Sequence, residues 1–336
     1  TLHKGKSVTG IDRVNKKVVA EDGTTADYDR LLLATGSNPF MIPVPGHDKD
    51  GVIAFRDIHD VDTMLAASKD YKKAVVIGGG LLGLEAANGL MKQGMDVSVV
   101  HLLDSLMERQ LDKPASALLK ASLEERGMNF LMEAETAEII GNGRVQGVRF
   151  KDGSEVEADL VVMGVGIVPN NELAKKSGLH CERGIVVNDT MQTFDPGIYA
   201  VGECAQHRGI AYGLVAPLFE QGKVAANQLA GLGYASYKGS VTSTKLKVTG
   251  IDLFSAGEFN EEEGDEVISL QDPASGTYKK LVLKDDRIKG AVLYGDTIDG
   301  TWYFQLMREG TSTVSYTHLT LPTIQHWCRS RWAAGR

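Results

Sequence analysis

The chain has 336 residues, a net charge of -8 and a hydrophobic content of 43%, which predicts about two domains and, without a basic run, no nucleic-acid partner. Its three cysteines, Cys181, Cys204 and Cys328, are too few and too scattered for a disulfide framework or a four-thiolate metal site. No signal peptide and no apolar run of 18 residues occurs, so we expect a cytoplasmic protein with no metal site and no membrane partner.

One stretch near the start of the chain occurs twice. Residues 19–39 read V-A-E-D-G-T-T-A-D-Y-D-R-L-L-L-A-T-G-S-N-P, and residues 149–169 read R-F-K-D-G-S-E-V-E-A-D-L-V-V-M-G-V-G-I-V-P. The Asp-Gly pair and the later glycine recur at one offset, since 152 − 22 and 166 − 36 both equal 130. Each copy predicts a hairpin with an Asp-Gly turn, an apolar strand and a glycine-containing loop.

Between the two copies, the stretch from Met41 to Gly46 carries two prolines and is interpreted as a linker. Asp57 is then a candidate N-cap for a helix that runs to Ser68. The apolar residues that we expect on one face of this helix are Ile58, Val61 and Leu65.

A glycine motif follows, in the context that dinucleotide binding requires. A short apolar strand, residues 74–77, is followed by G-x-G-x-x-G at Gly78, Gly80 and Gly83, a helical pattern to Gln93 and a second strand, residues 97–100. The first glycine permits a tight turn, the second lets a diphosphate approach the backbone, and the third lets the helix pack closely on the sheet. The alternative is a glycine-rich turn that binds no ligand.

The remaining elements are expected in the following order. Asp112 is a candidate N-cap for a helix over residues 113–126, and a short helix follows over residues 171–177. A strand over residues 185–187 and another over residues 198–201 come next, the latter ending in Gly202-Glu203, before a helix over residues 216–230. Short strands and a helix from Val241 to Thr313 predict a small α+β domain, and residues 314–336 look like a non-native tail.

The repeat predicts two doubly wound α/β dinucleotide-binding domains. The second copy closes the domain that Gly78 opens, whereas the glycine motif of the first copy would lie upstream of Thr1, so we expect the first domain to be incomplete. The expected domains are an FAD-binding domain at 1–69 and 188–240, an NAD(P)H-binding domain at 70–187, and the small domain at 241–313. Two dinucleotide domains suggest two dinucleotides, one of which delivers hydride to the other.

Several motifs carry a family resemblance. A-T-G at 34–36, G-G-G-L-L-G-L-E-A-A at 78–87 and I-Y-A-V-G-E at 198–203 resemble the two-domain pyridine-nucleotide flavoproteins. Five further stretches are similar to the large subunit of NAD(P)H-dependent nitrite reductase. They are V-V-H-L-L at 99–103, M-E-R-Q-L-D at 107–112, G-L-V-A-P at 213–217, S-T-K-L-K-V-T-G-I-D at 243–252 and G-D-T-I-D-G-T-W-Y at 295–303.

The resemblance implies a role for each matching residue. Gly78, Gly80 and Gly83 would hold the diphosphate of the nicotinamide nucleotide, with Glu85 near the nicotinamide as the catalytic residue. The other implied cofactor contacts are Gly164 and Gly166 beside that nucleotide, and Thr35, Gly36, Gly202, Glu203 and Leu218 beside FAD.

The sequence departs from the family pattern at three points. Glu203 stands where the usual acid is Asp, and His101 stands where an acid on the ribose is expected, about 20 residues after the motif. His101 is therefore a cofactor-binding candidate that leaves the choice between NADH and NADPH open; the alternative is an ordinary loop histidine. The chain also lacks a C-x-x-x-x-C pair, which argues against a disulfide reductase mechanism.

The resemblance implies an oxidoreductase of nitrate assimilation that passes hydride from NAD(P)H to FAD and then electrons to iron–sulfur and sirohaem centres that reduce nitrite to ammonia. Those centres would belong to downstream redox domains or a small subunit, so we expect this chain to be the electron-input portion and inactive alone. A reductase of rubredoxin or ferredoxin is the close alternative. As a fragment, the chain could also be a non-catalytic nucleotide-binding module.

Overall fold

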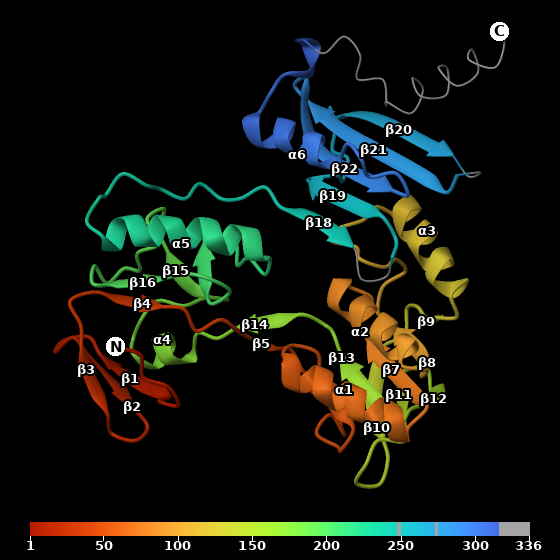
Figure 1. Ribbon diagram of the computed structural model, residues 1–336, viewed down its shortest axis with the longest axis horizontal. Helices are drawn as coiled ribbons and strands as arrows, with labels where there is room; N and C mark the ends of the chain where they lie inside the picture. The colour runs from red at the N-terminus through yellow and green to blue at the C-terminus, as the bar shows by residue number, and fades with distance from the viewer. Residues whose placement is uncertain (247–249, 273–274, 316–336) are drawn as a thin grey trace. The chain divides into compact units, whose positions relative to one another are not determined.

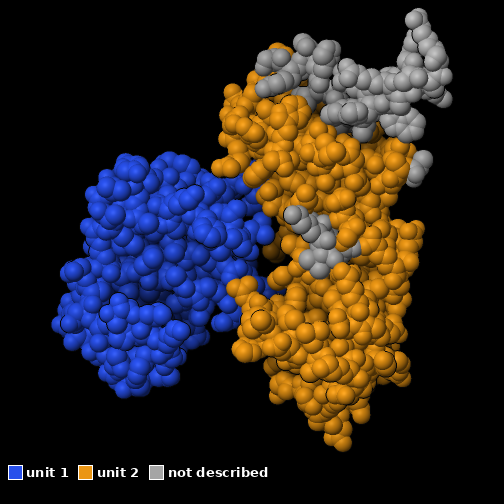
Figure 2. Space-filling view, viewed as in Figure 1, with its two compact units in different colours: residues 1–41, 166–242 blue, residues 42–165, 243–336 orange. Residues whose placement is uncertain are grey.

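The computed structural model describes residues 1–336 except 247–249, 273–274 and 316–336, so all but the first two residues of the tail at 314–336 lie outside the described residues (Figure 1). The chain forms two compact units, which Figure 2 colours separately. Unit 1 comprises residues 1–41 and 166–242, and unit 2 comprises residues 42–165 and 243–336. Within the described residues, every helix is too short or too polar to cross a bilayer.

Unit 2 is built around a parallel sheet of five strands in the order β6, β13, β7, β8 and β9 (Figure 1). The bounds of these strands are Val52–Ala54, Leu160–Met163, Lys73–Ile77, Asp96–Val100 and Asn129–Leu131. The helices of this part are α1 (Ile58–Asp70), α2 (Leu81–Lys92) and α3 (Lys113–Glu124). The strand, glycine turn, helix and strand expected around Gly78 are therefore confirmed.

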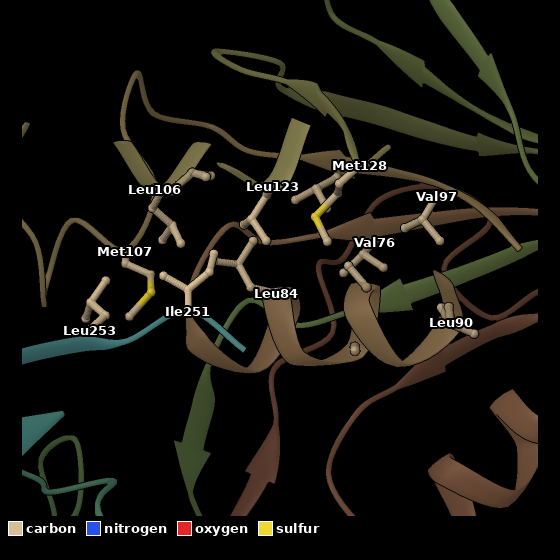
Figure 3. Packing of buried hydrophobic residues seen from close by; sticks show 14 of the residues in the cluster. Val76, Leu84, Leu90, Val97, Leu106, Met107, Leu123, Met128, Ile251 and Leu253 are labelled. Atoms are coloured by element: carbon tan, nitrogen blue, oxygen red, sulfur yellow. The ribbon is translucent and has the colours of Figure 1, made fainter. Parts of the chain in front are cut away.

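Burial on both faces explains why the central strands are continuously apolar. All four residues of β13 and the last four of β7 are buried, as is usual for parallel strands covered by helices. Figure 3 shows Val76 of β7 and Val97 of β8 packed with Leu84 of α2 and Leu123 of α3 in one core cluster. This core holds the glycine turn between β7 and α2 in a fixed position.

The duplication seen in the sequence is present in the structure, strand by strand. Strands β2, β3 and β5 recur as β11, β12 and β14 at the offset of 130 residues, and β4 recurs as β13 with one added residue. The bounds of the first set are Lys17–Ala20, Thr25–Asp27, Ser37–Pro39 and Leu31–Leu33. Those of β11, β12 and β14 are Gly147–Phe150, Glu155–Glu157 and Ile167–Pro169. With β1 (Val8–Asp12) and β10 (Thr136–Ile140), each copy forms a three-stranded antiparallel sheet.

Unit 1 carries shorter sheets. Parallel pairs join β4 to β16 and β15 to β17, and an antiparallel pair joins β5 to β14. The bounds not yet given are β15 (Ile185–Val187), β16 (Ile198–Ala200), β17 (Ala205–His207), α4 (Glu172–Lys176) and α5 (Val215–Leu229). Among the described residues β4 has one strand neighbour, whereas its counterpart β13 has two, one of which is the glycine-motif strand β7.

The pairing of β5 with β14 joins equivalent parts of the two copies. The amide of Phe40 donates to the carbonyl of Gly166 at 2.9 Å, and the amide of Asn170 donates to the carbonyl of Gly36 at 2.9 Å. Both donors lie four residues after the glycine of their copy, so the two bonds are related by the repeat. The segments around Gly36 and Gly166 are therefore equivalent pieces of the duplicated fold.

The C-terminal part of unit 2 is an antiparallel sheet in the order β18, β19, β22, β21 and β20, with helix α6 (Gly300–Glu309) packed on β22 and β19 (Figure 1). The strand bounds are Ser243–Leu246, Leu253–Gly257, Arg287–Tyr294, Thr277–Lys284 and Glu266–Asp272, and η1 (Thr313–Ser315) follows α6. The fold class expected from the sequence, two doubly wound α/β domains and a small α+β domain, is confirmed.

Asp112 ties this antiparallel sheet to α3. One oxygen of its carboxylate accepts from the amide of Ala115 and caps the helix, while the other accepts from the Tyr278 hydroxyl at 2.6 Å and lies 3.5 Å from the Lys280 amine. The Tyr278 side chain is buried, and this desolvation raises the pKa of its phenol. Figure 3 shows the apolar part of the same contact, where Ile251 and Leu253 approach Met107.

The compact units divide after Met41, Val165 and Thr242; β6 pairs with β13 and α1 packs on α2 in unit 2, while α4 packs on β1 in unit 1. One expectation differs from the structure. The expected apolar face of α1 is wrong: Ile58, Val61 and Leu65 are 71%, 37% and 40% exposed, and the helix buries Met64 and Ala67 instead. The capping box at Asp57, in contrast, is present.

Replacing Asp112 by alanine is expected to destabilise the protein more than replacing Asp57 by alanine. Each change removes an N-cap, which costs about 1 kcal/mol. Only Asp112→Ala also removes the acceptor of the buried Tyr278 hydroxyl, which adds about 1–3 kcal/mol. Urea unfolding of the full chain compares the two midpoints, and equal midpoints would show that Asp112 does not hold the antiparallel sheet.

Candidate functional site

The residues predicted to bind cofactors fall into two groups, one in each unit. Unit 2 holds Gly78, Gly80, Gly83, Glu85, His101 and Gly164, and unit 1 holds Thr35, Gly36, Gly166, Gly202, Glu203 and Leu218. Gly164 and Gly166, which were expected to border one nucleotide together, are thus divided between the two units.

Three glycines of unit 2 pack backbone against backbone. A Cβ atom added at Gly83 would lie 1.9 Å from the carbonyl oxygen of Gly78, one added at Gly78 would lie 2.4 Å from that of Gly164, and one added at Gly164 would lie 2.9 Å from the Cα of Gly83. Gly78 also has a φ of +122°, which side chains rarely tolerate. These positions bring the start of α2 onto the ends of β7 and β13.

Gly80 has the opposite surroundings. A Cβ atom added there would meet no described atom within 4 Å, although the residue is the N-cap of α2. The first turn of α2 carries no acidic side chain, so its free N–H groups and the positive end of its dipole face this open space. An anion such as a diphosphate fits such a space without displacing any side chain.

Glu85 lies in the second turn of the same helix. Its side chain is partly buried, and burial raises the pKa of its carboxyl group above the usual value. A carboxylate with a raised pKa beside a cofactor site is a candidate for a functional role.

His101, at the end of β8, contacts the glycine turn directly. Its Nδ1 accepts a hydrogen bond from the amide of Gly79 at 3.1 Å. Its Nε2 lies 3.4 Å from Oε2 of the Glu108 carboxylate. The carbonyl of Gly79 accepts from the amide of Met107 at 3.0 Å. Glu108 lies in the stretch M-E-R-Q-L-D that carries the family resemblance, but neither glycine spacing nor a strand end marks it as a site residue.

The group in unit 1 gathers at the carboxyl ends of β4 and β16, which pair in parallel. The Ser37 hydroxyl donates to the Glu203 carboxylate at 2.8 Å, and the Thr35 hydroxyl donates to the carbonyl of Asn170 at 2.5 Å. Glycine at 36 and 202 leaves open space, since an added Cβ atom at either position meets nothing within 4 Å. In an α/β fold, ligands bind at such strand ends.

Helix α5 completes this group. The amide of Gly202 donates to Oε1 of Gln221 at 3.0 Å, while Nε2 of the same side chain is buried and has no partner among the described residues. Leu218 lies in an open apolar groove on α5 of about 480 Å³. The sequence did not predict Ser37 or Gln221 as site residues. The only indication was that Ser37 follows Gly36 and that Gln221 lies three residues after Leu218.

The two described cysteines are not joined by a disulfide. Cys181 and Cys204 are both free, and Cys204 is fully buried against the carbonyls of Leu33 and Val201. Burial raises the pKa of the Cys181 thiol, which disfavours a reactive thiolate at that position.

Comparison with known proteins identifies the family. The sequence profile of the pyridine nucleotide-disulphide oxidoreductases matches residues 1–228, and that of the rubredoxin NAD+ reductase C-terminal domain matches residues 243–311. The chain belongs to the pyridine nucleotide-disulphide oxidoreductase family. This membership implies FAD and NAD(P)H as cofactors, although the chain lacks the C-x-x-x-x-C pair of a disulfide reductase.

Two relatives support the narrower resemblance stated from the sequence. Nitrite reductase [NAD(P)H] of Bacillus subtilis is 58% identical over 92% of this chain, and the assimilatory nitrate reductase electron transfer subunit of the same organism is 48% identical over 89%. The chain spans only 38% and 39% of the length of these two proteins. The resemblance to nitrite reductase large subunits is therefore confirmed for a part of such a protein.

A solved structure of similar fold is the ferredoxin reductase of Rhodopseudomonas palustris. It is 27% identical, has a TM-score of 0.83, and matches 91% of this chain and 77% of its own. The shared fold extends over both units and supports the α/β assignment.

The glycines of the turn are expected to respond differently to alanine. Gly83→Ala should lower the free energy of unfolding by about 1–3 kcal/mol, because the new methyl group overlaps the carbonyl of Gly78. Gly80→Ala should cost less, about 0.5–1 kcal/mol, because nothing occupies that space and only the preference of an N-cap for glycine over alanine is lost. Thermal unfolding measures both losses, and equal losses would contradict the close contact between Gly83 and Gly78.

Proposed function

We propose that the turn between β7 and α2 binds the diphosphate of NAD(P)H. The observation that carries this proposal is the open space at Gly80, where a helix N-terminus meets no side chain. The contacts among Gly78, Gly83 and Gly164 support it, because they keep the helix N–H groups aimed at that space. Glu85, one turn further along α2, is proposed to lie near the nicotinamide.

Unit 1 is proposed to hold FAD. Thr35 and Gly36 would contact the cofactor at the end of β4, and the Glu203 carboxylate would accept hydrogen bonds from its hydroxyl chain. The amino-terminal end of α5, where Leu218 lies, would stabilise negative charge on the reduced ring.

The function supported best is electron input in a flavoprotein oxidoreductase. When bound, FAD supplies the chemistry that accepts hydride from NAD(P)H, and the protein supplies binding, orientation and electrostatics. In a longer parent protein the electrons would go on to iron–sulfur and sirohaem centres, carried by downstream domains or a small subunit, that reduce nitrite to ammonia. The names of both Bacillus subtilis relatives support this assignment, and a cytoplasmic location is part of the proposal.

A reductase of a small electron carrier is the second candidate. It is favoured by the match of residues 243–311 to the rubredoxin NAD+ reductase C-terminal domain and by the structural likeness to a ferredoxin reductase. The two functions share the transfer from NAD(P)H to FAD and differ only in the acceptor.

Nucleotide binding is tested by replacing Gly80 with valine. The added side chain would fill the diphosphate space, so the affinity for NAD(P)H measured by calorimetry should fall roughly a hundredfold or more, which corresponds to the loss of two charge-assisted hydrogen bonds.

Gly89→Val is the matched control, because Gly89 lies in the same helix with equally open surroundings but away from the N-terminus. It should retain the affinity of the unchanged protein. Unchanged binding by Gly80→Val would remove Gly80 from the site and contradict the proposal.

Flavin retention is expected to be weak in this chain. The sequence contains one G-x-G-x-x-G motif, and it lies in unit 2, so unit 1 has no equivalent loop among its residues to hold the FAD diphosphate. The visible spectrum of the purified chain should show well under one flavin per polypeptide, even in samples that bind NAD(P)H. A stoichiometric yellow chromophore would contradict this expectation.

A further inference from the structure

We propose that Glu108, positioned by His101, is the acid that binds the 2′-hydroxyl of the adenosine ribose and makes this site prefer NADH to NADPH. The inference rests on the proposed binding of a nicotinamide nucleotide at the β7–α2 turn. It identifies a residue that the sequence pattern did not reveal, because the acid does not stand at the end of the strand.

His101 occupies the position where a ribose-binding acid is expected. It follows β8 directly, and β8 pairs in parallel with the glycine-motif strand β7. In this fold a carboxylate about 20 residues after the glycines accepts hydrogen bonds from the ribose hydroxyls. An imidazole that carries its proton on Nε2 cannot accept a hydrogen bond there, so another group has to supply the acceptor.

The hydrogen bond to the turn determines the tautomer of His101. Its Nδ1 accepts from the amide of Gly79, so in the neutral ring Nε2 carries the proton. The residue is only 9% exposed, and Nε2 has no hydrogen-bond partner among the described residues. The nearest carboxylate oxygen is that of Glu108, at 3.4 Å. The orphaned donor therefore faces an acid that it can position.

The backbone around Glu108 is held against the glycine turn. Its neighbour Met107 is fully buried, has a φ of +52° and donates its amide to the carbonyl of Gly79. Leu106, also fully buried, would contact a side chain at Gly79. Glu108 itself keeps 36% of its side chain exposed, so the carboxylate remains accessible to a nucleotide.

The other charged groups of this loop do not duplicate Glu108. Asp104 forms an ion pair with Lys113 at 2.6 Å, and the Lys113 amine lowers the pKa of that carboxyl. Arg109 is exposed on the same loop and is the cation that could attract a 2′-phosphate instead. A carboxylate at 108 accepts from a 2′-hydroxyl but repels a 2′-phosphate, so the two side chains predict opposite nucleotide preferences.

The experiment measures dissociation constants for NADH and NADPH by calorimetry on the full chain and its variants. The unchanged protein should bind NADH more tightly. Glu108→Gln should weaken NADH roughly tenfold, the effect of losing one hydrogen bond to a charged group, and leave NADPH equal or tighter. Asp104→Asn, the matched control, removes the same charge from the same loop and should leave both constants unchanged.

Two further variants separate positioning from direct binding. His101→Asn keeps an acceptor for the Gly79 amide but lacks Nε2, so it should retain nucleotide binding and lose most of the discrimination between NADH and NADPH. Glu108→Lys should reverse the preference toward NADPH, with Arg109→Gln as its control. Both substitutions at 108 lie at an exposed position, and unchanged thermal midpoints verify folding.

An unaltered NADH to NADPH ratio in Glu108→Gln and Glu108→Lys would overturn the inference while leaving nucleotide binding intact. Preference of the unchanged protein for NADPH, abolished in Arg109→Gln, would overturn it as well. Failure of the unchanged protein to bind either nucleotide would contradict the proposed function itself, and the inference with it.

Discussion

Direct contact between backbones at three glycines is the constraint on which the parallel-sheet part of unit 2 depends. Gly78, Gly83 and Gly164 come from a strand end, a helix and a neighbouring strand end, and no side chain fits between them. Their contact places the amino-terminal end of α2 over the carboxyl edge of the sheet. The proposed binding of a diphosphate at Gly80 depends on these three contacts, because a helix that packed less closely on the sheet would not direct its N–H groups at the open space there.

Periodicity and turn chemistry predicted much of this architecture. The glycine motif, the Asp57 and Asp112 caps and the duplicated hairpins follow local rules that act within a few residues, and the structure contains them all. The buried face of α1 could not be predicted this way. Its apolar residues lie on two sides of the helix, and the neighbouring sheet and α2 determine which side is covered.

The candidate site likewise contains residues that local sequence rules predict and residues that they do not. Glycines at fixed spacing could be recognised because their role is to lack a side chain, and the acid after β16 could be recognised because it ends a strand. Ser37, Gln221 and Glu108 could not, because each is placed by a contact between segments that are distant in sequence or by a loop without a pattern.

The double role of Asp112 has a consequence for motion. The Asp112 carboxylate caps the first turn of α3 through one oxygen and accepts from a tyrosine of the antiparallel sheet through the other, so any movement of this side chain disturbs both contacts. Fraying of that helix and detachment of strand β21 therefore belong to a single opening event. Amide hydrogen exchange in these two segments should then proceed with a common free energy, although they are separated by more than 150 residues along the chain.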